Sequence, residues 1–370
     1  MSDIHFYFHI PFCYRKCPYC SFVSFEKKLG LVDEYVNAIL KEIEAFKTNN
    51  TLKTIYFGGG TPTILKIEHI DRILNEIFKR FKTDVKEITI EAIPLRLKVE
   101  YLKSLKNLGV NRISLGIQSF LDFKLKKLGR LHSSKDNLKA IESVFNVGFD
   151  NVSVDLIYGV GESLSDLEEE IKHLQSYPFK HISTYMLSVE EGTPFFKLYE
   201  NGKLKINSDE QLADFYLFLC DALKNLSFLQ YEVSNFAKSG FKSMHNLAYW
   251  DLKEYKGFGV SASSFVDFTR FKNSEKLDVY LKNPTSCYTI EEKLDNLELA
   301  KEMLIFGLRK NSGVSFDKIK AKTGIDLERL FKHKIDEFID MGFLEKSSSK
   351  IKFKDCKAMV ISNAILSQFV

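Results

Sequence analysis

The sequence predicts an α/β protein: a partial (β/α)6 parallel barrel followed by a smaller C-terminal α+β domain. Short β-rich runs alternate six times with stretches of helical period, polar groups follow five successive strands, and the pattern changes over residues 291–370. A chain of 370 residues also exceeds one typical core, which favours a large domain with a smaller one. The alternation alone fits an open doubly wound sheet equally well.

The six expected strands are short runs rich in β-branched and aromatic residues. They cover residues 4–10, 53–59, 87–93, 111–117, 151–157 and 181–187. Between them, apolar residues recur at helical spacing over residues 32–47, 66–81, 98–108, 134–147 and 164–176. Strands separated by helices are expected to pair in parallel, with the helices on the outside.

Composition excludes several classes of protein. A hydrophobic share of 45% and a charged share of 28% are typical of a soluble globular chain. The formal charge of +4 is too small for a dedicated nucleic-acid surface. No apolar run approaches the ~20 residues of a membrane span, and the first residues show no signal peptide. We therefore expect a reducing cytoplasmic location, where disulfides are disfavoured, and leave transient membrane association open.

Three of the six cysteines, Cys13, Cys17 and Cys20, lie in the run CYRKCPYC after the first strand. Structural zinc usually takes four ligands in paired clusters, and no second CxxC is present. Three thiolates would hold a four-iron cluster and leave one iron open for a ligand. The spacing favours such a cluster, with zinc or inert thiols as the alternative. The remaining cysteines are scattered and are expected to be buried small hydrophobic residues: Cys220, Cys287 and Cys356.

Polar groups also follow the later strands. The stretch GGGTPT (58–63) follows the second strand, Glu91 closes the third, Gln118 follows the fourth, and Asp155 lies near the end of the fifth. Ligands of parallel sheets gather at the carboxyl ends of the strands, so these groups are expected at one rim. Alone, GGGTP would be read as a tight turn.

The run CxxxCxxC after a first strand resembles the signature of the radical S-adenosylmethionine (SAM) superfamily. This resemblance implies a [4Fe-4S] cluster held by Cys13, Cys17 and Cys20. It also implies that SAM chelates the open iron through its amino and carboxylate groups. One electron from the cluster would then cleave the sulfonium and release a 5′-deoxyadenosyl radical.

More narrowly, the chain resembles the oxygen-independent coproporphyrinogen III oxidase group. The resemblance runs through FYFHIPFCYRKCPYCSF, GGGTPT, EAIP, NRISLGIQSF, LGRLH and VDLIYGVGE. It implies a SAM site formed by Tyr7, Tyr19, Gly58, Gly59, Gly60, Thr61, Glu91, Gln118, Arg130 and Asp155. Simple packing is the alternative role for the two tyrosines.

Two branches of this group differ in their motifs. The oxidases carry a fourth cysteine two positions after the third, where this chain has Phe22. The heme chaperone branch, the HemW-like proteins, carries the HNxxYW pattern found here as HNLAYW. Within it, His245, Tyr249 and Trp250 are the expected heme contacts, since imidazole ligates heme iron and aromatic rings pack on the macrocycle. A structural role is the alternative for His245.

The resemblance therefore implies a heme chaperone that binds a [4Fe-4S] cluster, SAM and heme, and transfers heme to acceptor proteins. The alternative is an enzyme, a coproporphyrinogen III oxidase that decarboxylates propionates by radical chemistry. The implied partners are heme or porphyrin, heme-accepting proteins with respiratory ones among them, and an electron donor such as a flavodoxin or ferredoxin.

The chain departs from the pattern of the group at four positions. Ser21 stands where the third cysteine is usually followed by Asp, and Ile93 replaces the usual Asn of EAIP. In GFGVSASSF (257–265), Ser261 replaces a glycine and Ser263 a histidine of the group. Any ligand role carried over to this loop is therefore in doubt.

We expect three parts: a radical SAM partial barrel over 1–235, a connecting segment with HNLAYW over 236–290, and a winged-helix-like domain over 291–370. The last part has helix candidates at 296–309, 315–322 and 327–341, then a hairpin around SSSK and a final helix. It holds 15 Lys and Arg against 13 Asp and Glu. Because phosphate binding needs several focused contacts, no nucleic-acid partner is expected.

Overall fold

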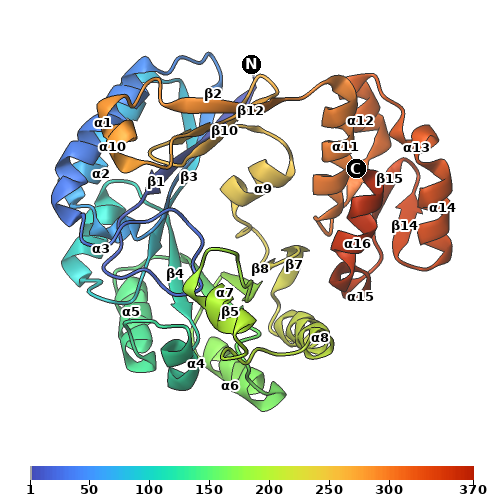
Figure 1. Ribbon diagram of the computed structural model, residues 1–370, viewed down its shortest axis with the longest axis horizontal. Coiled ribbons are helices and arrows are strands. Elements are labelled where there is room, and N and C mark those ends of the chain that lie inside the picture. The colour runs from blue at the N-terminus through green and yellow to red at the C-terminus, as the bar shows by residue number, and fades with distance from the viewer. Residues whose placement is uncertain (1) are drawn as a thin grey trace.

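A computed structural model describes residues 2–370 and consists of one large open sheet, its covering helices, and a smaller C-terminal unit (Figure 1). The large sheet has the strand order β12-β11-β10-β9-β1-β2-β3-β4-β5-β6-β8-β7 and does not close. A second sheet of three strands, β13-β15-β14, belongs to the C-terminal unit. Within the described residues, no helix is both long and apolar enough to cross a membrane.

The six predicted strands are confirmed and pair in parallel in chain order. They are β1 (Asp3–Ile10), β2 (Thr51–Gly59), β3 (Thr83–Ala92), β4 (Arg112–Gln118), β5 (Asn151–Tyr158) and β6 (His181–Met186). The helices between them cover the outer face of the sheet (Figure 1). They are α1 (Val32–Ala45), α2 (Ile67–Arg80), α3 (Val99–Asn107), α4 (Asp122–Lys127), α5 (Ser134–Asn146) and α6 (Leu164–Gln175). Of these, α4 was not predicted.

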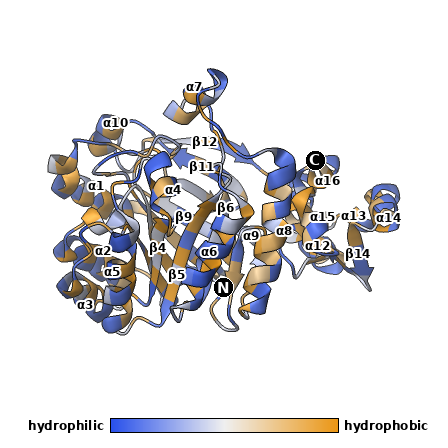
Figure 2. Cartoon of the chain, turned by 90° about the horizontal axis from the view of Figure 1, so that it is seen from below, coloured by the Kyte–Doolittle hydropathy of each residue, from blue (hydrophilic) through white to orange (hydrophobic). Residues whose placement is uncertain are grey.

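The alternation of side chains along β1 shows why the sheet has an apolar outer face and a polar inner one. Phe6 and Phe8 are fully buried, and Phe8 stacks between Phe57 of β2 and Phe258 of β9 at ring distances of 5.1 and 4.9 Å. Successive side chains of a strand point to opposite faces, so Tyr7 and His9 face the interior. Figure 2 shows hydrophobic residues along the strands and alternating hydrophobic and hydrophilic residues on the covering helices.

The remaining strands extend the sheet at both ends with mostly antiparallel pairs. After β6 come α7 (Pro194–Glu200), α8 (Asp209–Asn225), β7 (Leu229–Glu232) and β8 (Asn235–Ala237). Residues 236–290, expected as a connecting segment, supply α9 (Met244–Trp250), β9 (Glu254–Phe258), β10 (Ser263–Val266), β11 (Thr269–Asn273) and α10 (Leu277–Lys282), and β12 (Tyr288–Lys293) follows. β9 pairs in parallel with β1. The boundaries at 235 and 290 stay a prediction.

The C-terminal unit contains the predicted helices and hairpin. They are α11 (Asn296–Leu308), β13 (Val314–Ser315), α12 (Phe316–Thr323), α13 (Leu327–Leu330), α14 (Lys332–Asp340), β14 (Leu344–Ser347), β15 (Lys350–Phe353), α15 (Cys356–Val360) and α16 (Ser362–Leu366). The helix expected over 327–341 forms two pieces, and the final helix also forms two. Ser348, in the hairpin turn, has a φ of 55°. This small unit lies to one side of the open barrel, with α9 between them (Figure 1).

Candidate functional site

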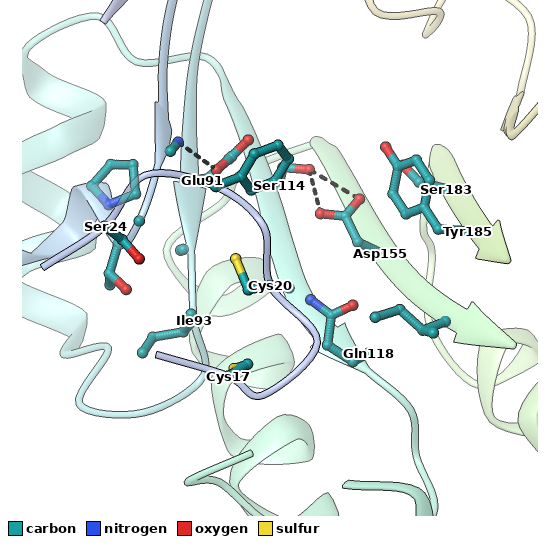
Figure 3. Close-up of a pocket in the computed structure, with 18 of the residues that line it drawn as sticks. Cys17, Cys20, Ser24, Glu91, Ile93, Ser114, Gln118, Asp155, Ser183 and Tyr185 are labelled. Atoms are coloured by element: carbon teal, nitrogen blue, oxygen red, sulfur yellow. Dashed lines mark hydrogen bonds between the residues drawn. The ribbon is translucent and has the colours of Figure 1, made fainter. Parts of the chain in front are cut away.

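A cavity of about 560 Å³ lies at the carboxyl ends of the parallel strands. Every predicted SAM and cluster residue except Gly58 lines it. Those residues are Tyr7, Cys13, Cys17, Tyr19, Cys20, Gly59, Gly60, Thr61, Glu91, Gln118, Arg130 and Asp155. Figure 3 shows Cys17 and Cys20 on the loop that crosses the cavity, with Glu91, Ser114 and Asp155 on the neighbouring strands β3, β4 and β5. The structure thus brings together groups that are more than 140 residues apart in the sequence.

Backbone hydrogen bonds hold the cysteine loop across the mouth of the barrel. Cys13 N donates to Phe25 O at 3.2 Å, and Phe25 N donates to Pro11 O at 2.6 Å, which closes the loop on itself. Gly129 packs on Pro18, since a Cβ at this glycine would lie 2.6 Å from Pro18 Cδ, and its φ of 67° also favours glycine. The segment around Gly129, which follows α4, therefore packs against the cysteine loop.

All three thiols of the loop are free and partly exposed. Arg130 Nη1 donates to Cys17 Sγ at 3.2 Å, and Thr61 Oγ1 donates to Cys13 Sγ at 3.8 Å. Burial raises the pKa of Cys13 and of Cys20, so both are held mainly as thiols while no cation is present. A bound iron would compensate this effect, because a coordinating thiol is deprotonated.

The thiols fit a cluster better than a single ion. Over residues 2–370, no three His, Cys, Asp or Glu side chains converge as ligands of one metal ion. A four-iron cluster makes a different demand, because each thiolate binds a different iron and the thiols must stand apart around it. Cys13, Cys17 and Cys20 are free, lie on one loop and line the cavity, so they are the residues that would hold such a cluster.

The glycine turn after β2 has no space for side chains. A Cβ at Gly60 would lie 2.7 Å from Phe12 O and 3.0 Å from Cys13 Sγ. A Cβ at Gly59 would lie 2.7 Å from the His9 ring, and Gly59 has a φ of 110°. The turn therefore brings bare backbone against the cysteine loop, where N–H groups can meet a ligand.

Glu91 is the carboxylate at the end of β3. It accepts hydrogen bonds from Tyr56 OH at 2.9 Å and from Gly59 N at 3.2 Å. Burial raises the pKa of Glu91 to about 7, and the nearby Asp155 carboxylate adds to this effect while the Tyr56 hydrogen bond opposes it. An amino group that donates a hydrogen bond to Glu91 would favour its charged form.

Gln118, Arg130 and Asp155 lie on the other side of the cavity. Gln118 has a φ of 65°, at an irregularity in the pairing of β4 with β5. Besides Cys17, Arg130 donates to Gly116 O at 3.0 Å and to Tyr19 OH at 3.4 Å. Asp155 accepts from Ser114 Oγ at 3.0 Å, and burial raises the pKa of Asp155. This side offers carboxylate, amide and guanidinium groups to a polar ligand.

Several lining residues were missed by the sequence reasoning. They are Tyr56, Arg112, Ser114, His181, Ser183 and Tyr185. Side chains two residues apart in a strand point to the same face, and this spacing could have identified Arg112 and Ser114. They lie on β4 and line the cavity together with Gln118. Polar side chains at alternate positions of a strand with apolar partners indicate an inward-facing polar surface.

Helix α9 places the HNLAYW segment inside the open barrel, against β2 and β9 (Figure 1). His245 is only 2% exposed and stacks on Tyr56 at a ring distance of 5.0 Å. Both of its ring nitrogens are engaged: Nδ1 shares a hydrogen bond with Thr54 Oγ1 at 2.7 Å, and Nε2 shares one with Tyr249 OH at 2.9 Å. Burial lowers the pKa of His245 well below its usual range. The imidazole is therefore neutral and already paired.

A second cavity of about 510 Å³ adjoins the first at the cysteine loop. It shares Tyr7, Ser21, Phe22 and Tyr249 with the first cavity. Its other lining residues are His9, Val23, Trp250, Leu252, Tyr255, Ser261, Ser263, Arg270, Lys272, Glu275 and Phe306. Both serines at which the chain departs from the group pattern, Ser261 and Ser263, thus line this second cavity.

Comparison with known protein families gives two matches. Residues 7–174 match the radical SAM superfamily, and residues 294–355 match the HemN C-terminal domain. Among solved structures, the chain resembles the coproporphyrinogen III oxidase HemN of Escherichia coli, described as a radical SAM enzyme. The TM-score is 0.85 at 19% identity, covering 100% of this chain and 90% of that one. This likeness establishes the fold.

Two curated relatives match nearly the whole chain. The heme chaperone HemW of Lactococcus lactis subsp. lactis (strain IL1403) is 35% identical over 367 residues, covering 98% of this chain and 96% of the relative. The heme chaperone HemW of Bacillus subtilis (strain 168) is 36% identical over 373 residues, covering 98% of both chains.

Proposed function

We propose that this chain binds heme and delivers it to acceptor proteins. The premise is its family: the chain belongs to the radical SAM superfamily and, within it, to the family of the heme chaperone HemW. Heme is the cargo in this proposal, whereas the [4Fe-4S] cluster and SAM are resident groups. The acceptors are heme-dependent proteins, respiratory ones among them, and a flavodoxin or ferredoxin is the class of electron donor that suits the cluster.

The full-length likeness to two heme chaperones carries this proposal. The oxidase alternative rests on the HemN likeness, which at 19% identity speaks for the fold alone. Phe22 adds to the case, because it stands where the oxidases carry their fourth cysteine. Its side chain is 64% exposed beside both cavities and offers no thiolate.

In this proposal Cys13, Cys17 and Cys20 hold the cluster. When bound, the cluster supplies an open iron position for SAM and one electron. Two residues of the chain lie directly beside the thiols. Arg130 Nη1 donates to Cys17 Sγ at 3.2 Å, and Gly60, which has no side chain, leaves space beside Cys13.

The residues around the rest of the cavity suit the parts of SAM. Glu91 accepts hydrogen bonds from the amino group, with the backbone of Gly58–Thr61 meeting the methionine end. Gln118 and Asp155 suit the ribose hydroxyls, and Arg130 suits the carboxylate. Tyr7 and Tyr19 flank the site, where Tyr7 OH and His9 Nδ1 lie 3.1 Å apart.

The heme contacts in this proposal are on α9. Tyr249 and Trp250 line the second cavity, and Tyr249 lines the first cavity as well. His245 reaches the first cavity, and an iron bond from its Nε2 would replace the hydrogen bond to Tyr249. Imidazole is a common axial ligand, and aromatic faces pack on the macrocycle.

A hemin titration followed at the Soret band tests the proposal. The wild type is expected to bind hemin with saturation at a fixed stoichiometry, and His245→Ala is expected to bind more weakly. His69→Ala is the matched control, because His69 is buried, lines neither cavity, and has both ring nitrogens in hydrogen bonds, to Lys66 N at 3.2 Å and to Asp33 Oδ1 at 2.7 Å.

The outcomes distinguish the heme chaperone function from the role of His245 as a ligand of the heme iron. If the wild type shows no saturable binding, the chaperone function is wrong, and turnover of coproporphyrinogen III becomes the next assay. If the wild type binds hemin and both alanine variants lose affinity equally, the function stands, but His245 has only a structural role.

A further inference from the structure

The second cavity lies between the sheet and the C-terminal unit, which is a usual position for a ligand. Its walls come from the cysteine loop, from the end of α9, from β9–β11 and from α11. Phe306 of α11 meets Trp250 edge-to-face at a ring distance of 6.0 Å, so the C-terminal unit forms one wall. The shared residues Tyr7, Ser21, Phe22 and Tyr249 form the wall between this cavity and the first.

Aromatic side chains dominate the walls of the second cavity. Phe22, Tyr249, Trp250, Tyr255 and Phe306 all line it. Phe22 leaves 64% of its surface exposed, although a phenyl ring gains most from burial. A flat, apolar ligand would cover this ring and stack on its neighbours.

Two cations line the same cavity, and they differ in how firmly they are held. Arg270 forms ion pairs with Glu292 and with Glu302, the latter at 2.5 Å between Nη2 and Oε2. Within residues 2–370, the ion pair of Lys272 is with Glu275 at 2.6 Å, and the two side chains are 32% and 58% exposed. An exposed pair of this kind contributes little free energy, so Lys272 can turn to an anionic ligand.

The available space separates the two cavities by ligand. The cluster and SAM are assigned to residues of the first cavity, which has a volume of about 560 Å³, so the cargo is expected in a space of its own. The second cavity has a volume of about 510 Å³, and two of its lining side chains, Ser261 and Ser263, are small. It therefore offers a separate space for a large flat ligand next to the SAM cavity.

We propose that the second cavity binds the tetrapyrrole cargo, with the macrocycle against Phe22, Trp250 and Phe306 and a propionate on Lys272. This inference rests on the proposed function and adds the location of the cargo and the group that recognises its carboxylate. His245 lines only the first cavity, so in this placement it acts on the cargo through Tyr249, to which its Nε2 is hydrogen-bonded, and not through an iron bond. Phe22 lines both cavities and so borders both cargo and SAM.

Hemin titrations of two variants test the charge and the space. Lys272→Ala is expected to weaken hemin binding about tenfold, the effect of losing one charge-assisted hydrogen bond, and to leave binding of hemin dimethyl ester unchanged. Lys276→Ala is the matched control, because Lys276 is a nearby lysine that does not line the cavity. Ser263→Phe fills the cavity and is expected to abolish binding of both hemin forms while the SAM dissociation constant stays the same.

Phe22→Asp provides a second test of the space that does not depend on repacking, since this side chain is largely exposed. It is expected to weaken both hemin forms with no change in the circular dichroism spectrum. If the wild type does not bind hemin, the proposed function itself fails. If the wild type binds and Lys272→Ala matches it, the carboxylate contact is wrong; if Ser263→Phe and Phe22→Asp both match it, the cargo lies elsewhere.

Discussion

The first cavity is built by strands that follow one another along the chain, whereas the second is built by segments that are distant in the sequence. Strands β1 to β5 each deliver a polar group to the first cavity, and each strand pairs with the next. The second cavity needs the cysteine loop, the end of α9, the β9–β11 strands and Phe306 of α11. Residues 21–23 there meet residues from 249 onward.

This difference shows which parts of a site a sequence can reveal. A parallel sheet fixes where the end of each strand lies, so one rule places all the polar groups of the first cavity. No such rule places Lys272 in the same cavity as Phe22. Their placement depends on the order of neighbouring strands, in which β11 is joined to β1 by β10 and β9. The four predictions below test whether the two regions are as independent in function as they are in construction.

The largest effect is expected from Cys17→Ser, which removes one of three thiolates from the first cavity. The anaerobically reconstituted variant should lose the brown absorbance and the bound iron and sulfide. Cys220→Ser is the control, because Cys220 is buried on α8, far from the loop in sequence. If the two cavities act independently, hemin affinity of Cys17→Ser should stay within about twofold of the wild type.

Full iron and sulfide content in Cys17→Ser would show that the cluster assignment is wrong. Loss of hemin binding together with the cluster, in a variant that stays folded, would instead show that the cysteine loop couples the two cavities.

The second prediction concerns the ion pair that joins β9 to α1 and its contribution to the stability of the protein. Lys256 Nζ lies 2.6 Å from Glu42 Oε1, and Glu42 also accepts from Asn273, Gly259 N and Tyr280 OH. Both partners are buried, so Lys256→Met leaves an uncompensated carboxylate. The free energy of unfolding should fall by about 3 kcal/mol.

Urea unfolding followed by circular dichroism measures this loss. Lys53→Met is the matched control, since Lys53 pairs with Asp84 near the surface and its loss should lower the stability much less. Equal losses in the two variants would contradict a special role for the buried pair in attaching β9 to α1.

The predictions from the sequence were correct where patterns are local. The six parallel strands and five of the six helices between them, all except α4, were predicted within a few residues, because period-2 and period-3.6 patterns mark them directly. The strands β9–β12 were missed: they are four to six residues long, and their neighbours in the sheet are selected by distant segments. The Glu42–Lys256 pair, 214 residues apart, has no sequence signal of its own.

A third prediction concerns pH and the first cavity. Because burial raises the pKa of Glu91 to about 7, a proton competes with the SAM amino group below that pH. The dissociation constant for SAM should rise up to about tenfold for each pH unit between 7 and 5. Isothermal titration calorimetry at several pH values measures this rise.

Glu91→Gln should bind SAM weakly with little pH dependence over the same range. If the wild type also shows a flat profile, Glu91 does not hold the amino group. Hemin binding at fixed ionic strength should not follow the titration of Glu91, since this residue does not line the second cavity.

The smallest effects compare two helix N-caps, one on α6, which lines neither cavity, and one on α9, which lies beside both. Ser163 Oγ caps α6 by accepting from Asp166 N at 3.3 Å, and Ser243 Oγ caps α9 by accepting from Asn246 N at 3.2 Å. Each change to alanine should lower the free energy of unfolding by about 1 kcal/mol. Only Ser243→Ala should also weaken hemin binding, by a few fold, because α9 carries Tyr249 and Trp250 into the second cavity. Equal hemin affinity in the two variants would mean that the position of α9 does not limit cargo binding.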